Sequence, residues 1–74
     1  MNGQAHYSSV QADVMAALEA HGPCTVTQIA QYTGRTKQNI TETVRDLHKC
    51  KFVRVYGTVK AGYGNTARIW EAVE

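Results

Sequence analysis

A stripe of polar side chains between positions 37 and 49 has the chemistry needed to read the edges of DNA bases. A step of about 100° per residue along a helix places these side chains on one ridge: Gln38, Glu42, Arg45 and Lys49, flanked by Lys37 and Thr41. Glutamine can pair with adenine, arginine or lysine with guanine, and glutamate with cytosine, while threonine can touch the thymine methyl group. The stripe therefore favours contact with bases. The alternative is an ordinary solvated helix face, because two acidic–basic pairs have the i, i+3 spacing of surface ion pairs: Glu42–Arg45 and Asp46–Lys49.

The charges of the chain are segregated along the sequence. All eight lysines and arginines lie between positions 35 and 68, where only Glu42 and Asp46 oppose them, so this segment has a net charge of +6. The rest of the chain holds four carboxylates and no lysine or arginine, a net charge of −4. Clustered cations release counterions from phosphates. The bias favours a polyanionic partner over a solvated face that happens to be basic.

The polar stripe belongs to a segment, residues 25–52, with the spacing of two helices joined by a tight turn. Ile40, Val44 and Leu47 fall at i, i+4 and i+7, which is one apolar helix face. Gly34 can adopt the positive φ of a sharp turn, and Thr36 is a favourable N-cap for the second helix. The segment therefore predicts a helix-turn-helix whose second helix, over about 37–50, carries the stripe.

Capping signals predict where the other helices begin. Ser8 and Gln11 form a capping box, and the helix that starts there should end at Gly22 and Pro23. Thr25 and Gln28 repeat the pattern at the start of the second helix, after a short apolar link that could be a minimal strand. Residues 1–7 have no periodic pattern and are expected to form a flexible arm of a single domain over residues 1–74.

After the third helix the sequence pattern changes to that of strands. Residues 52–56 and 67–73 are rich in β-branched and aromatic side chains, which predicts a hairpin around a glycine-containing loop over 57–65, with Lys60 near its tip. Trp70 is expected in the core because so small a domain needs its largest apolar side chain there. The other residues predicted to be buried are Val14, Leu18, Ile29, Ile40, Val44, Leu47 and Ile69.

This order of elements defines an α+β winged helix-turn-helix, with three helices followed by a β-hairpin wing. The pattern Ile29-Ala30…Thr33-Gly34…Ile40-Thr41…Val44…Leu47, then Phe52-Val53, resembles the MarR-like transcriptional regulators. The resemblance implies a recognition helix over 36–50 in the major groove and a wing over 56–68 on the DNA backbone. Lys51 stands where these regulators usually have a glycine, which predicts a different helix end. The predicted DNA contacts are Arg35, Thr36, Lys37, Gln38, Thr41, Arg45, Lys49, Lys60 and Arg68.

Other classes of function have little support in the sequence. The three histidines and two cysteines lack C-x-x-C and H-x-x-x-H spacing, so no metal site or cofactor is expected. The sequence also lacks a nucleotide-binding glycine loop and a nucleophile–base or paired-carboxylate set, so no enzymatic activity is expected. Without a signal peptide pattern or an apolar run of about 18 residues, a cytoplasmic protein with no membrane partner is expected.

Two functions remain open at this stage. The first is sequence-specific binding of double-stranded DNA by a small regulator or repressor, of the size that bacteriophages and mobile elements encode, either as a monomer or as a homodimer. The second is a winged-helix module that binds another protein through the same polar face, for example a phage-encoded inhibitor or assembly factor. Glu42 favours the second function, whereas the clustered cations and the Gln/Thr/Arg ridge favour the first.

Overall fold

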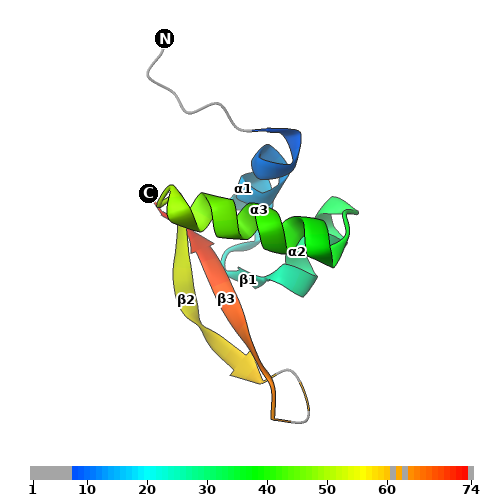
Figure 1. Cartoon of the computed structure of the whole chain (residues 1–74), viewed down its shortest axis with the longest axis vertical. Coiled ribbons are helices and arrows are strands. Elements are labelled where there is room, and N and C mark those ends of the chain that lie inside the picture. The colour runs from blue at the N-terminus through cyan, green and yellow to red at the C-terminus, as the bar shows by residue number, and fades with distance from the viewer. Residues whose placement is uncertain (1–7, 61, 63, 74) are drawn as a thin grey trace.

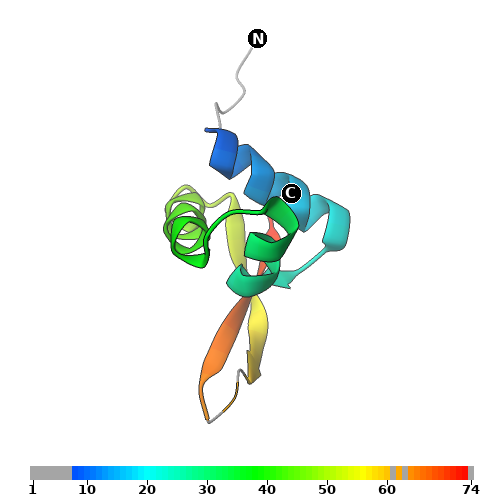
Figure 2. The ribbon, with the colours of Figure 1, turned by 90° about the vertical axis from the view of Figure 1, so that its right-hand side faces the viewer.

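The computed structural model describes residues 8–60, 62 and 64–73. The arm predicted for residues 1–7 lies outside this range. The elements follow in the order α1 (Ser9–His21), β1 (Cys24–Thr25), α2 (Val26–Thr33), α3 (Lys37–Lys49), β2 (Val53–Lys60) and β3 (Thr66–Ala72). The helices gather at one end of the molecule, and β2 and β3 extend away from them as a long hairpin (Figures 1 and 2). The winged helix-turn-helix predicted from the sequence is confirmed.

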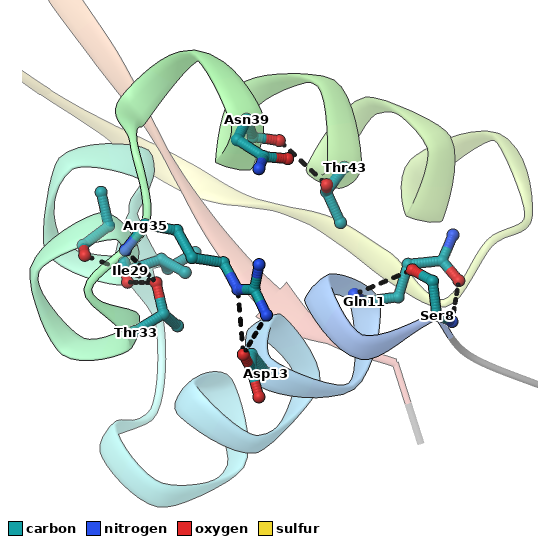
Figure 3. Close-up of polar contacts among 9 residues, drawn as sticks. Ser8, Gln11, Asp13, Ile29, Thr33, Arg35, Asn39 and Thr43 are labelled. Atoms are coloured by element: carbon teal, nitrogen blue, oxygen red, sulfur yellow. Dashed lines mark hydrogen bonds and ion pairs between the residues drawn. The ribbon is translucent and has the colours of Figure 1, made fainter.

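Both predicted capping boxes form. The Ser8 hydroxyl accepts a hydrogen bond from the Gln11 backbone N–H at 3.3 Å, and the Gln11 side chain accepts one from the Ser8 N–H at 3.0 Å (Figure 3). At the start of α2, the corresponding bonds between Thr25 and Gln28 measure 3.2 and 2.9 Å. These bonds satisfy N–H groups that have no partner within the helix and so fix where α1 and α2 begin.

The two ends of α3 are both set by local backbone chemistry. Gly34 has φ 73° and ψ 16°, and the Thr36 hydroxyl accepts from the Asn39 N–H at 3.1 Å, as predicted for the turn and the N-cap. At the C-terminal end of α3, the different helix end that the sequence predicts from Lys51 is wrong. Lys51 itself adopts φ 65°, the left-handed conformation that glycine favours, and its N–H donates to the His48 carbonyl at 3.0 Å. A lysine there keeps the glycine-like helix end at a cost of about 1–2 kcal/mol.

The sheet has three antiparallel strands in the order β1-β3-β2, rather than only the two strands of the predicted hairpin. The short link before α2 is the third strand, and its Cys24 lies opposite Trp70. The predicted 57–65 loop is too long, because β2 continues to Lys60. The strand passes Gly57 through a bulge between Val55 and Gly57 and then pairs with β3 as far as Thr66.

The core lies where the three helices meet the base of the hairpin. Its buried apolar residues are Val14, Met15, Ala17, Leu18, Cys24, Ile29, Ile40, Val44, Leu47, Val53 and Trp70. The predicted core is therefore confirmed apart from Ile69, which is only half-buried. Adjacent strand residues point to opposite faces, so the burial of Trp70 turns Ile69 away from the core. None of the helices in the described part of the chain is long and apolar enough to cross a membrane.

Candidate nucleic-acid interface

A groove with a volume of about 660 Å³ lies between α3 and the hairpin. In Figure 1, α3 crosses the molecule and the hairpin leaves below it. Both elements and the start of α2 contribute residues to the groove lining. The residues that line the groove are Thr25, Val26, Thr27, Lys37, Thr41, Val44, Arg45, His48, Thr58, Thr66, Ala67, Arg68 and Trp70.

The side of α3 that faces the groove coincides only in part with the polar stripe predicted from the sequence. The groove is lined by residues at i, i+4, i+8 and i+11 of α3: Lys37, Thr41, Arg45 and His48. Of the four predicted ridge residues, only Arg45 reaches it, while Gln38, Glu42 and Lys49 are exposed outside the groove. Helical periodicity finds the face opposite the core, but it cannot show beside which flank of the helix the hairpin will pack. The polar surface of α3 therefore comprises a groove side and an outer side.

The hairpin presents a polar face to the groove. Thr58 lies opposite Arg68 in the antiparallel ladder, and Lys60 lies opposite Thr66. Directly opposed residues share a face, as do residues two apart along a strand, so these four side chains lie on one side of the hairpin. The other side holds Val59 opposite Ala67 and Gly57 opposite Ile69. The predicted wing residues Lys60 and Arg68 are thus brought to the side that borders the groove.

The charge of the groove is positive. Lys37, Arg45 and Arg68 line it, and no carboxylate does so among the described residues. Two acid–base pairs that could have neutralised α3, Glu42–Arg45 and Asp46–Lys49, are not within ion-pair distance in the described structure. Three cations facing one concave surface without a counter-charge give a site that attracts anions.

Two other arginines of the basic segment are already paired. The Arg35 guanidinium reaches across to α1, where its Nε and Nη2 atoms both lie 2.9 Å from Asp13 Oδ2 (Figure 3). Arg54 Nε lies 2.7 Å from Glu71 Oε2. The sequence predicts Arg35 as a DNA contact, yet its side chain is directed toward a carboxylate 22 residues away, a pairing that local spacing does not reveal.

His48 lines the groove but is not among the residues predicted to contact DNA. Its imidazole meets the Trp70 ring edge-on, with the ring centroids 5.1 Å apart and the planes at 67°. Trp70 is 6% exposed, so the tryptophan belongs to the core and also lines the groove. The signal that could have found His48 is its spacing of three residues from Arg45 and seven from Thr41, which continues the groove side of α3.

The start of α2 also contributes to the lining of the groove. Val26 and Thr27 are the first two residues of α2 and both line the groove. Helix N-termini present unpaired N–H groups and a partial positive charge, which favour phosphates. Thr36, the last of the predicted contacts, is exposed and caps α3 with its hydroxyl.

The two cysteines do not contribute to this surface. Burial raises the pKa of the Cys24 thiol, whose Sγ atom donates to the Gly22 carbonyl at 3.1 Å, and Cys50 is exposed at the end of α3. In the part of the chain that the structure describes, no three histidine, cysteine or carboxylate side chains gather as a metal site would require.

The described chain has three helices, a tight turn between α2 and α3, and a β-hairpin beside α3. This arrangement defines a winged helix-turn-helix domain. A family model described as the MarR family matches residues 7–62, and the chain belongs to that family. This family comprises winged-helix regulators rather than enzymes, which confirms the expectation that the chain has no enzymatic activity. No curated protein sequence gives a significant match.

Solved structures of ZitR from Lactococcus lactis are similar in fold. A single-residue mutant of ZitR matches with a TM-score of 0.78 and 16% identity, over 100% of this chain and 48% of that chain. Wild-type ZitR in complex with DNA matches with a TM-score of 0.73 and 14% identity, over 97% of this chain and 47% of that one. A cysteine-to-serine mutant of ZitR in complex with DNA matches with a TM-score of 0.73 and 15% identity, over 99% of this chain and 47% of that chain. This chain therefore spans about half the length of the ZitR chains it resembles.

Proposed function

We propose that the chain binds double-stranded DNA in a sequence-specific manner and acts in the cytoplasm as a small transcriptional regulator. The observation that carries this proposal is the groove between α3 and the hairpin, which three cations line without a carboxylate among the described residues. The MarR-family match and the fold shared with ZitR, which has been solved in complex with DNA, support the same function. Such a protein would repress transcription by occupying its site, as a monomer or as a homodimer.

The division of α3 into two sides suggests how it would engage DNA. With α3 in the major groove, the outer side would offer Gln38 to base edges, while Thr41 and Arg45 would lie where the bases meet the backbone. Arg45 has no ion-pair partner in the described structure, so its guanidinium is available for guanine or for a phosphate. Base contacts from this helix would supply the sequence preference.

The groove would hold the sugar–phosphate backbone that borders the major groove. Lys37 from α3 and Arg68 from the wing both line this space, as do the first two residues of α2. Lys60 lies two residues beyond Thr58 on the same face of the hairpin, so it would extend the contact along the strand. These contacts would fix the position of the protein on DNA without reading the sequence.

A second function, binding of a protein partner, is favoured by the apolar surface of β2. Tyr56 and Val59 of this strand are 62% and 45% exposed, so the hairpin offers apolar side chains that a partner could cover. Glu42 on the outer side of α3 would also repel phosphates. A phage-encoded inhibitor or assembly factor would use these surfaces.

A binding assay on two duplexes tests the proposed function. We expect the wild type to bind a duplex obtained by selection more tightly than a scrambled duplex of equal length, at physiological salt. Gln38→Ala should weaken binding to the selected duplex by about 1–3 kcal/mol and should weaken binding to the scrambled duplex much less. Gln31→Ala is the matched control, because Gln31 is exposed on α2 outside the groove. Equal affinity of the wild type for both duplexes would contradict the regulator and favour the protein partner.

A further inference from the structure

We propose, on the basis of the DNA binding inferred above, that His48 is a phosphate-binding residue whose protonation makes the complex tighter at low pH. His48 lines the groove in line with Thr41 and Arg45, near the C-terminal end of α3. Its side chain is exposed within the groove, so a phosphate can approach the imidazole without displacing any core residue.

The contact with Trp70 holds His48 in the groove. The two rings meet edge to face with centroids 5.1 Å apart, and Trp70 is itself fixed in the core by its place in β3 opposite Cys24. One side of the imidazole is thus covered by a rigid aromatic ring. A histidine ring held in this way loses less conformational freedom on binding a phosphate than a long, mobile lysine would.

The charged groups around His48 are all of one sign within the groove. Lys37 and Arg45 face the space from α3 and Arg68 faces it from β3, whereas the groove residues of β1, α2 and β2 are uncharged. Glu71 follows Trp70 in β3 but points to the opposite face of the strand, where it bonds Arg54. A proton on His48 would therefore add to an uncompensated positive field, and a bound phosphate would relieve that repulsion.

Protonation changes what the ring can offer to a phosphate. A neutral imidazole has one N–H donor, whereas the protonated ring has two donors and a full positive charge. Histidine side chains gain this charge as the pH falls from 8 toward 5. Each additional cation on duplex phosphates steepens the dependence of log affinity on log salt by about 0.9. Binding should therefore become both tighter and more salt-sensitive as the pH falls.

A second histidine in the described structure provides the matched control. His21 stacks on Tyr32 with centroids 3.8 Å apart and interplanar angle 11°, in the cleft between α1 and α2. It also lies beside an aromatic ring, but it does not line the groove. Replacing either histidine with glutamine removes the same titrating group, so the comparison isolates position in the fold.

The experiment measures affinity for one duplex at pH 6 and pH 8, each over a series of salt concentrations. The proteins are the full chain as wild type and as His48→Gln, His48→Arg and His21→Gln. For the wild type and His21→Gln we expect binding about two- to fivefold tighter at pH 6 and a salt slope steeper by about 0.9. His48→Gln should lose this difference, and His48→Arg should show the steeper slope at both pH values.

The outcomes separate this proposal from the one on which it rests. A wild type that binds duplex DNA at neither pH contradicts the DNA-binding function itself. A wild type that binds DNA while His48→Gln keeps the same pH dependence overturns the role of His48 and leaves DNA binding intact. Circular dichroism of His48→Gln at both pH values checks that the variant is folded, and this exposed position gives no reason for a change in fold.

Discussion

Two clefts in this molecule each hold a histidine beside an aromatic ring, yet their surroundings differ in charge. In the groove between α3 and the hairpin, the His48 ring meets Trp70 edge-on, and three cations share the lining. In the smaller cleft of about 320 Å³ between α1 and α2, the His21 ring stacks on Tyr32 beside Asp13 and three alanines. Both clefts therefore pair a histidine with an aromatic ring, so aromatic content does not identify the functional surface.

The pairing of charges distinguishes the two clefts. Arg35 lies at the turn before α3, but Asp13 beside the smaller cleft neutralises it. The cations of the groove have no such partner in the described structure. The number of cations in a segment therefore says less about a binding surface than the number that the fold leaves without a carboxylate. For this chain the distinction predicts which basic residues matter for DNA and which matter for the fold.

The largest expected effect is a loss of stability in the core that supports both clefts. Leu47 of α3 is 1% exposed in the core that α1, α2 and the base of the hairpin share, so Leu47→Ala should lower the free energy of unfolding by about 2–5 kcal/mol. Asp46→Ala, its exposed neighbour on α3, should change stability by less than about 0.5 kcal/mol. Urea unfolding followed by circular dichroism measures both. A loss below about 1 kcal/mol for Leu47→Ala would mean that α3 is not anchored as described.

The next effect compares the groove with the outer surface of the same helix. Arg45 lines the groove, whereas Lys49 lies one turn further along and outside it. Arg45→Ala should cost about 1–3 kcal/mol of binding free energy on the preferred duplex, and Lys49→Ala should cost less. Titration of a labelled duplex gives both values. If Lys49→Ala weakens binding as much as Arg45→Ala, a cation of α3 gains no importance for DNA binding from lining the groove.

A smaller effect compares an unpaired with a paired cation in one strand. Lys60 and Arg54 both belong to β2, but Arg54 is bonded to Glu71. Lys60→Ala should lower the salt slope of binding by about 0.9 for every duplex, because one phosphate contact is lost. Arg54→Ala should leave the slope unchanged although it removes the same charge. Equal slopes for Lys60→Ala and the wild type would show that the wing does not reach the backbone.

The sequence predicts most of the fold because local signals decide it. The capping boxes at Ser8 and Thr25 and the left-handed Gly34 depend on neighbours within a few residues, and the structure places all three as expected. The extension of β2 to Lys60 was missed because it depends on a partner strand, with Gly57 tolerated only where a bulge allows it. Because glycines are typical of loops, the predicted loop begins at Gly57 and is longer than the observed one.

The candidate site is less predictable, for a related reason. Periodicity identifies the polar side of α3, but the hairpin that turns one flank of it into a groove comes later in the chain and packs through Trp70. His48 gains its place only from that packing. The same holds for Arg35, which local spacing assigns to the turn and the structure directs toward α1. Contacts between distant segments decide which polar residues share a surface.

The smallest effect concerns that ion pair, whose side chains are 31% and 48% exposed. If Arg35 serves the fold, Arg35→Gln and Asp13→Asn should each cost about 0.2–1 kcal/mol of stability, and the double variant should cost little more than either one. The salt slope of DNA binding should then stay unchanged in Arg35→Gln, because Asp13 already neutralises the charge that is removed. A phosphate-binding Arg35, as the sequence predicts, would behave differently. Arg35→Gln would lower the slope by about 0.9, and Asp13→Asn would tighten binding by freeing the guanidinium.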